Sequence, residues 1–203
     1  MEIDDLTLVR RCKEGDRPAF KLLVQKYERK VYAIAFGMVK DREEARDIAQ
    51  EAFLKVHRSL GTFKGDASFS TWLHRIVRNL AIDKIRAKRN ESLSFDDAVG
   101  ADEEVEPGFI ATRLGTDPQR GALRRELAAK LNEALAQLPL KHREILLLRE
   151  VEGMSYEDLA QTLDVPKGTV MSRLFHARSK MQKLLEGYLD EDPLAFASGG
   201  DEG

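Results

Sequence analysis

The sequence has almost no cysteine and no long apolar run. The first absence excludes an internally disulfide-bonded protein, and the second argues against a membrane protein. The single cysteine, Cys12, cannot form an internal disulfide, which fits a reducing cytoplasm. No run of eighteen apolar residues occurs, so we expect no membrane insertion. The first residues, Met1 to Asp5, are acidic and unlike a secretory signal. We therefore expect a cytoplasmic protein.

Signatures of catalysis and of bound cofactors are also missing. There is no G-x-x-x-x-G-K phosphate loop, which argues against ATP-driven work. The four histidines have neither metal-ligand spacing nor a neighbouring nucleophile, and they are His57, His74, His142 and His176. We therefore expect no enzyme, no cofactor and no metal site.

The charge is segregated along the chain, although the net charge is only −2. Residues 1–90 carry +7 and residues 123–189 carry +2, whereas residues 91–122 carry −6 and residues 190–203 carry −5. Two basic segments on either side of an acidic connector indicate two places where a polyanion can bind. The alternative is that these charged side chains are only solvated, and this alternative is strong for residues 123–189.

Apolar residues recur every three or four positions in both basic segments, which is typical of helices. Helical patterns cover residues 5–60, 70–88, 118–137 and 140–151, and Asp41 is a candidate cap for a helix ending at Ser59. Residues 91–122 lose this period and gain Asp, Glu, Gly and Pro. We predict an all-α fold of two small helical domains, 1–90 and 123–189, joined by a flexible acidic linker, 91–122. Residues 190–203 are predicted to be a disordered acidic tail.

The stretch from Ser155 to Leu185 has the pattern of a helix-turn-helix. Ser155 and Asp158 form a capping box, and Pro166 breaks the first helix. A second helix begins near Lys167, with an apolar inner stripe and a polar, basic outer arc. An ordinary helical hairpin with a solvated face is the alternative. The candidate DNA contacts on this helix are Lys167, Thr169, Met171, Ser172, Arg173, Phe175 and His176.

The helix predicted over residues 70–88 has a second candidate nucleic-acid face. Trp72, Leu73 and Val77 point inward, while arginines and an asparagine occupy the opposite arc. Arginine neutralises phosphates, and aromatic rings of the preceding loop can take up unstacked bases. Trp72 and at least one of the two loop phenylalanines can instead pack in the core. The candidate residues of this region are Phe63, Lys64, Asp66, Phe69, Arg75, Arg78, Asn79 and Arg86.

The helix ending at Ser59 presents a charged face opposite its core stripe. Its exposed positions are Glu43, Asp47, Gln50, Glu51 and Lys55. Carboxylates at 43, 47 and 51 could serve a metal-dependent nuclease, but no histidine stands at ligand spacing to them. We favour a solvated or protein-binding face.

Three blocks together resemble the extracytoplasmic-function branch of bacterial sigma factors. Residues 47–56, D-I-A-Q-E-A-F-L-K-V, are similar to the segment that binds the clamp helices of RNA polymerase, which implies contacts by Asp47, Gln50, Glu51 and Lys55. Residues 63–79, with F-S-T-W-L and R-I, resemble the segment that melts and reads the minus-ten element. Residues 153–160, G-M-S-Y-E-D-L-A, with G-T-V and S-R after them, resemble the reader of the minus-thirty-five element.

The resemblance implies a promoter-specificity subunit with three kinds of partner: core RNA polymerase, promoter DNA and an anti-sigma factor. It also implies a monomer in the free state and no catalysis. Relatives often carry arginine where this chain has Met171 and His176. A free-standing helix-turn-helix regulator is the alternative, but it leaves residues 47–56 and the arginine arc of residues 75–89 without a task.

Overall fold

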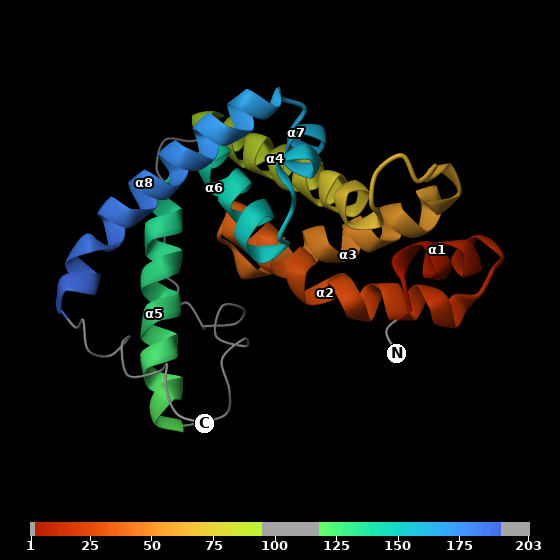
Figure 1. The fold of residues 1–203 in the computed structure, drawn as a ribbon, viewed down its shortest axis with the longest axis horizontal. Coiled ribbons are helices and arrows are strands. Elements are labelled where there is room, and N and C mark those ends of the chain that lie inside the picture. Colours follow the sequence, from red (N-terminus) through yellow and green to blue (C-terminus); the bar gives the residue numbers. More distant parts are fainter. Residues whose placement is uncertain (1–2, 95–117, 192–203) are drawn as a thin grey trace.

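The computed structural model describes residues 3–94 and 118–191, and every regular element in these ranges is helical. We call residues 3–94 the N-terminal half and residues 118–191 the C-terminal half. The predicted all-α fold of two helical units is confirmed (Figure 1). The N-terminal half contains α1 (Asp5–Lys13), α2 (Arg17–Val39), α3 (Arg42–Ser59), the 3-10 turn η1 (Leu60–Thr62) and α4 (Phe69–Ser94).

Aspartate caps define the starts of the first three helices. The carboxylates of Asp4, Asp16 and Asp41 accept hydrogen bonds from backbone N–H groups in the first turns of α1, α2 and α3. Between α2 and α3, Lys40 adopts a left-handed conformation with φ of 64° and ends α2. These local signals explain why α3 begins next to Asp41, as predicted.

The C-terminal half contains a short-helix pair in front of its longest helix. The predicted capping box is present: Ser155 accepts from the Asp158 N–H, and the Asp158 side chain accepts from the Ser155 N–H. Asp164, with φ of 53°, ends the helix that this capping box begins. The elements are α5 (Pro118–Gln137), α6 (Leu140–Leu146), the π-helix η3 (Leu147–Val151), α7 (Tyr156–Leu163) and α8 (Lys167–Glu191).

The two halves share one apolar core. Leu23, Ile34 and Leu73 from the first half belong to the same buried cluster as Ile145 and Leu159 from the second. In Figure 1, α4 passes behind α6 and α7, while α5 and the end of α8 extend away from the N-terminal half. The predicted units therefore pack against each other, which places α7 against α4.

The described residues of the predicted linker 91–122 and of the predicted tail 190–203 are helical. α4 continues to Ser94 and α5 begins at Pro118, so both ends of the 91–122 segment are helical. α8 extends to Glu191, so the first two residues of the predicted 190–203 tail, Asp190 and Glu191, are helical. Glu91 to Ser94 extend α4 because nothing in that stretch breaks a helix. The remaining predicted linker and tail residues lie outside the described ranges.

Candidate nucleic-acid interface

α7, the turn at Asp164–Pro166 and α8 form the predicted helix-turn-helix. Leu159 of α7 and Val170 and Leu174 of α8 are buried between them, which fixes the angle of the pair. Lys167 Nζ lies 2.8 Å from Glu157 Oε2 and links the starts of the two helices. This packing leaves one long face of α8 free to enter a major groove.

The outer face of α8 is rich in exposed side chains. Met171 and Phe175 are 56% and 69% exposed, one helical turn apart, which is unusual for large apolar residues. Apolar side chains in a major groove contact the thymine methyl group. Of the seven predicted contact residues, Lys167, Met171, Ser172, Phe175 and His176 are exposed, and Thr169 and Arg173 are half-buried.

A cationic cluster flanks this face. Burial lowers the pKa of His142, and the nearby charges of Lys141, His176, Lys180 and Arg173 lower it further. The Nδ1 atom of His142 is buried without a hydrogen-bond partner. Several cations gathered beside an exposed helix face suit the phosphates of a duplex.

Part of the arginine arc of α4 contacts the C-terminal half. Asn79 and Arg86 are exposed, as predicted. The Arg75 guanidinium donates to the carbonyl oxygen of Gln161 in α7, and Arg78 donates to the carboxylate of Glu144 in α6. Arg78 also donates to Asn79 Oδ1 at 3.3 Å. Two predicted DNA contacts therefore bind the C-terminal half in this structure.

The loop before α4 corrects one prediction. Phe63 and Phe69 are 6% and 1% exposed, and their rings pack edge to face with centroids 6.0 Å apart. Both therefore belong to the core, together with the half-buried Trp72, and neither ring is open to an unstacked base. Lys64 and Asp66 are exposed as predicted, and Gly65 between them has φ of 85°, a conformation that favours glycine.

The charged face of α3 is open. Asp47, Gln50, Glu51 and Lys55 are all exposed, and Glu51 Oε1 lies 3.4 Å from Lys55 Nζ. Glu43 is paired with Arg46 at 2.6 Å. Within residues 3–94 and 118–191, no three His, Cys, Asp or Glu side chains gather as metal ligands. The exposed α3 side chains are therefore accessible to a partner molecule.

The contacts between the halves are not apparent from any sequence pattern. Thr71 Oγ1 donates to Asp158 Oδ1 at 3.0 Å, and His74 Nε2 lies 3.0 Å from Glu152 Oε2. Both α4 residues are buried, and their partners lie about 80 positions further along the chain. No local pattern could have revealed such pairs.

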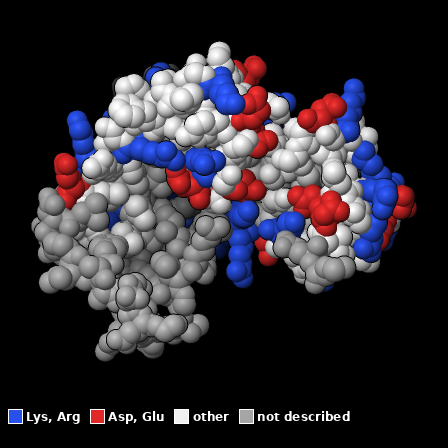
Figure 2. Space-filling model, in the orientation of Figure 1, with Lys and Arg blue, Asp and Glu red and all other residues white. Residues whose placement is uncertain are grey.

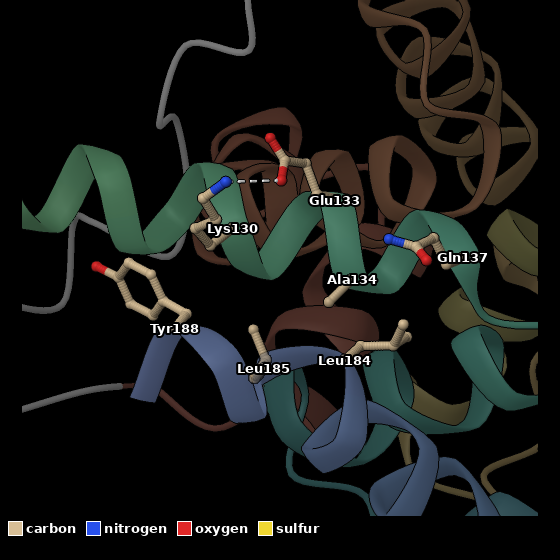
Figure 3. Close-up of a pocket in the computed structure, with 7 residues that line it drawn as sticks. All are labelled: Lys130, Glu133, Ala134, Gln137, Leu184, Leu185 and Tyr188. Carbon is tan, nitrogen blue, oxygen red and sulfur yellow. Dashed lines mark hydrogen bonds and ion pairs between the residues drawn. The ribbon is translucent and has the colours of Figure 1, made fainter. Parts of the chain in front are cut away.

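Two other surface features lie away from these faces. A hollow of about 280 Å³ lies between α5 and the end of α8, and its lining includes Lys130 and Glu133 of α5 and Leu184 and Tyr188 of α8 (Figure 3). Figure 2 shows Lys and Arg side chains gathered at the right-hand end of the molecule, where Figure 1 places α1. None of the described helices is long and apolar enough to cross a membrane.

Comparison with known proteins agrees with this arrangement. Residues 23–91 match the family described as Sigma-70 region 2, and residues 128–181 match Sigma-70, region 4. The RNA polymerase sigma-H factor of Pseudomonas aeruginosa is 43% identical over 187 residues, covering 92% of this chain and 96% of the relative. The ECF RNA polymerase sigma-E factor of Escherichia coli K12 is 38% identical over 189 residues, covering 91% and 97%.

Solved structures have the same fold. The sigma factor RpoE, solved in complex with the anti-sigma factor NepR from Bartonella quintana, is 25% identical with a TM-score of 0.68 and covers 82% of this chain and 96% of its own. CnrH, solved with the cytosolic domain of CnrY, has a TM-score of 0.63 at 23% identity and covers 90% and 97%. From this evidence, the chain belongs to the extracytoplasmic-function branch of the sigma-70 family of RNA polymerase sigma factors.

Proposed function

We propose that this chain directs core RNA polymerase to specific promoters by reading the minus-thirty-five element and melting the minus-ten element. The observation that carries the proposal is the presence of two separate nucleic-acid faces and one open charged face on a single chain. A free-standing regulator needs only the helix-turn-helix, whereas this chain matches both sigma regions. RNA synthesis itself belongs to the polymerase.

We assign one function to each of the three faces. The exposed α3 residues Asp47, Gln50, Glu51 and Lys55 bind the polymerase. The outer face of α8, from Lys167 to His176, reads the minus-thirty-five duplex, with Met171 and Phe175 placed for thymine methyl groups. Asn79, Arg86 and the 64–68 loop serve the minus-ten strand, joined by Arg75 and Arg78 when these are released from the C-terminal half.

The burial of the loop phenylalanines changes how melting works. Extruding a base costs on the order of a few kcal/mol, and stacking on an aromatic ring returns roughly 1–3 kcal/mol. Phe63 and Phe69 are buried and offer no such stacking. Base capture therefore depends on polar groups such as Lys64, Asp66 and Asn79 together with phosphate contacts. The polymerase supplies the remaining free energy that melting requires.

We also propose control by an anti-sigma factor, because RpoE and CnrH, which share this fold, were each solved with a bound protein. The protein acts in the cytoplasm, where the polymerase is, and is a monomer before it binds.

In vitro transcription with purified core polymerase tests the proposal. Core polymerase plus this chain should give a transcript from a promoter that core alone does not use. A chain that binds promoter DNA but yields no polymerase-dependent transcript would instead be a free-standing regulator. Cleavage of the template with magnesium and without polymerase would indicate a nuclease.

A further inference from the structure

Met171 presents an accessible thioether on the helix face that the proposed function assigns to the minus-thirty-five duplex. Its side chain is 56% exposed on α8, and Phe175, which is 69% exposed, follows one helical turn later. We propose that Met171 is a site of reversible oxidation, at which a peroxide converts the thioether to a sulfoxide and weakens binding of this duplex. The inference rests on the proposed function.

The other methionines of the described residues are protected from this reaction. Met38 and Met154 are 2% and 4% exposed, and both belong to the core. The Met154 sulfur also accepts a hydrogen bond from Thr162 Oγ1 at 3.8 Å. Met181 is half-buried and packs against the same core. Because oxidation of a side chain follows its exposure, Met171 is the described methionine that a dissolved peroxide reaches first.

The oxidation needs no catalytic group from the protein. A lone pair of the Met171 sulfur attacks one oxygen of hydrogen peroxide, the O–O bond breaks, and the other oxygen leaves as water. The sulfur gives up two electrons and gains one oxygen, so thioether and peroxide become sulfoxide and water. Two thiols of a methionine sulfoxide reductase return the electrons, become a disulfide and release the oxygen as water. The modification is therefore reversible.

A sulfoxide changes what the α8 face can contact in a major groove. The thioether is apolar and packs against a thymine methyl group, whereas the sulfoxide is polar and carries a hydrogen-bond acceptor. Thymine O4, beside that methyl group, is an acceptor as well and offers no proton to the new oxygen. Burying an acceptor without a donor costs free energy, so the affinity for the duplex should fall.

The effect should be confined to this contact. The packing of α8 depends on buried side chains such as Val170 and Leu174, whereas Met171 lies on the solvent side of the helix. The sequences of α3 and α4, which carry the proposed polymerase and minus-ten faces, contain no methionine. Oxidation should therefore weaken recognition of the minus-thirty-five element and leave polymerase binding intact.

The test begins with full-length chain in which Cys12→Ser removes the single cysteine. This chain and the same chain with Met171→Leu are treated with hydrogen peroxide, and peptide mass spectrometry locates the added oxygen. Leucine is apolar, close in volume to methionine and a good helix former, but it has no sulfur. We expect Met171 to gain oxygen before Met38, Met154 and Met181. An effect of any other oxidised site would appear in both chains.

Binding is measured by fluorescence anisotropy on a duplex from a promoter that the chain activates in the transcription assay. Each chain is compared with its own untreated form. Oxidation should weaken binding by the Met171 chain about tenfold and should not weaken binding by the Met171→Leu chain. The two methionine sulfoxide reductases, one for each sulfoxide epimer, should restore the affinity. A duplex with deoxyuridine in place of thymine lacks the methyl groups, and oxidation should affect its binding little.

Three results would overturn the proposal: earlier oxidation of a buried methionine, unchanged affinity after oxidation of Met171, or an equal loss of affinity in the Met171→Leu chain. Preference of the untreated chain for the promoter duplex over a scrambled duplex tests the proposed function separately.

Discussion

His74 Nε2 of α4 lies 3.0 Å from Glu152 Oε2, at the junction of η3 and α7, and this pair joins the two halves of the chain. The His74 side chain is fully buried and that of Glu152 is 6% exposed. A buried pair contributes little net stability, but removing one member leaves the other without compensation. The pair therefore makes the packing of the halves specific.

Glu152→Ala should lower the free energy of unfolding by about 3 kcal/mol, because it leaves His74 and Lys30 facing an empty position. Chemical denaturation followed by circular dichroism measures this change. Glu150→Ala is the matched control: Glu150 lies two residues away and pairs with Arg178 at 2.7 Å on the surface, so its loss should cost less than about 1 kcal/mol. Equal effects of the two substitutions would show that the buried pair has no special role.

Glu51→Arg should weaken binding to core polymerase by about tenfold, or ~1.4 kcal/mol, since it reverses a charge in the centre of the open α3 face. Binding is measured by fluorescence anisotropy, with helicity checked by circular dichroism. Glu28→Arg, an equal reversal at an exposed site on α2, should have little effect. Normal assembly of the Glu51 variant would mean that this face is merely solvated.

Arg173→Ala should weaken binding to the minus-thirty-five duplex. If Arg173 contacts phosphate, affinity should fall evenly across sequences and the salt slope should decrease by about one. If it reads guanine, the loss of roughly 1–3 kcal/mol should depend on the sequence. Titrations at several salt concentrations separate the two patterns, with Lys183→Ala, exposed further along α8, as the control. Unchanged affinity for every duplex would remove Arg173 from the site.

Binding of this duplex should become tighter as the pH falls from about 7.5 to about 5.5. Burial and the charges of Lys141, His176, Lys180 and Arg173 lower the pKa of His142 in the free chain. Phosphates bound by that cluster offset its positive charge and raise the pKa, so DNA binding takes up a proton, which acid favours. His142→Gln should flatten the pH profile. A profile that is unchanged by His142→Gln would contradict this linkage.

Local signals in the sequence predicted most of the elements, because caps and breaks act over a few residues. The Ser155–Asp158 box, the break at Pro166 and the cap at Asp41 all stand where expected. Amphipathic spacing also assigned the outer faces of α3 and α8 correctly.

The contacts between the halves could not be predicted in this way, since they join residues far apart in the chain. Arg78 was placed on a DNA face from its position on a helical wheel, but a wheel cannot show that Glu144 lies opposite it. Phe63 and Phe69 stand among small polar residues typical of a loop, so the sequence left both base stacking and core packing open for them, and the structure shows both rings packed against Trp72.

The most direct test of the account is permanganate footprinting of the minus-ten element by holoenzyme containing wild-type chain or Asn79→Ala. Asn79 is exposed on α4, and its side chain can donate and accept hydrogen bonds at the edge of a flipped base. The account predicts that the variant binds duplex promoter nearly as well as wild type but melts fewer sites and changes the preferred downstream base. Equal melting by both chains on all downstream sequences would contradict it.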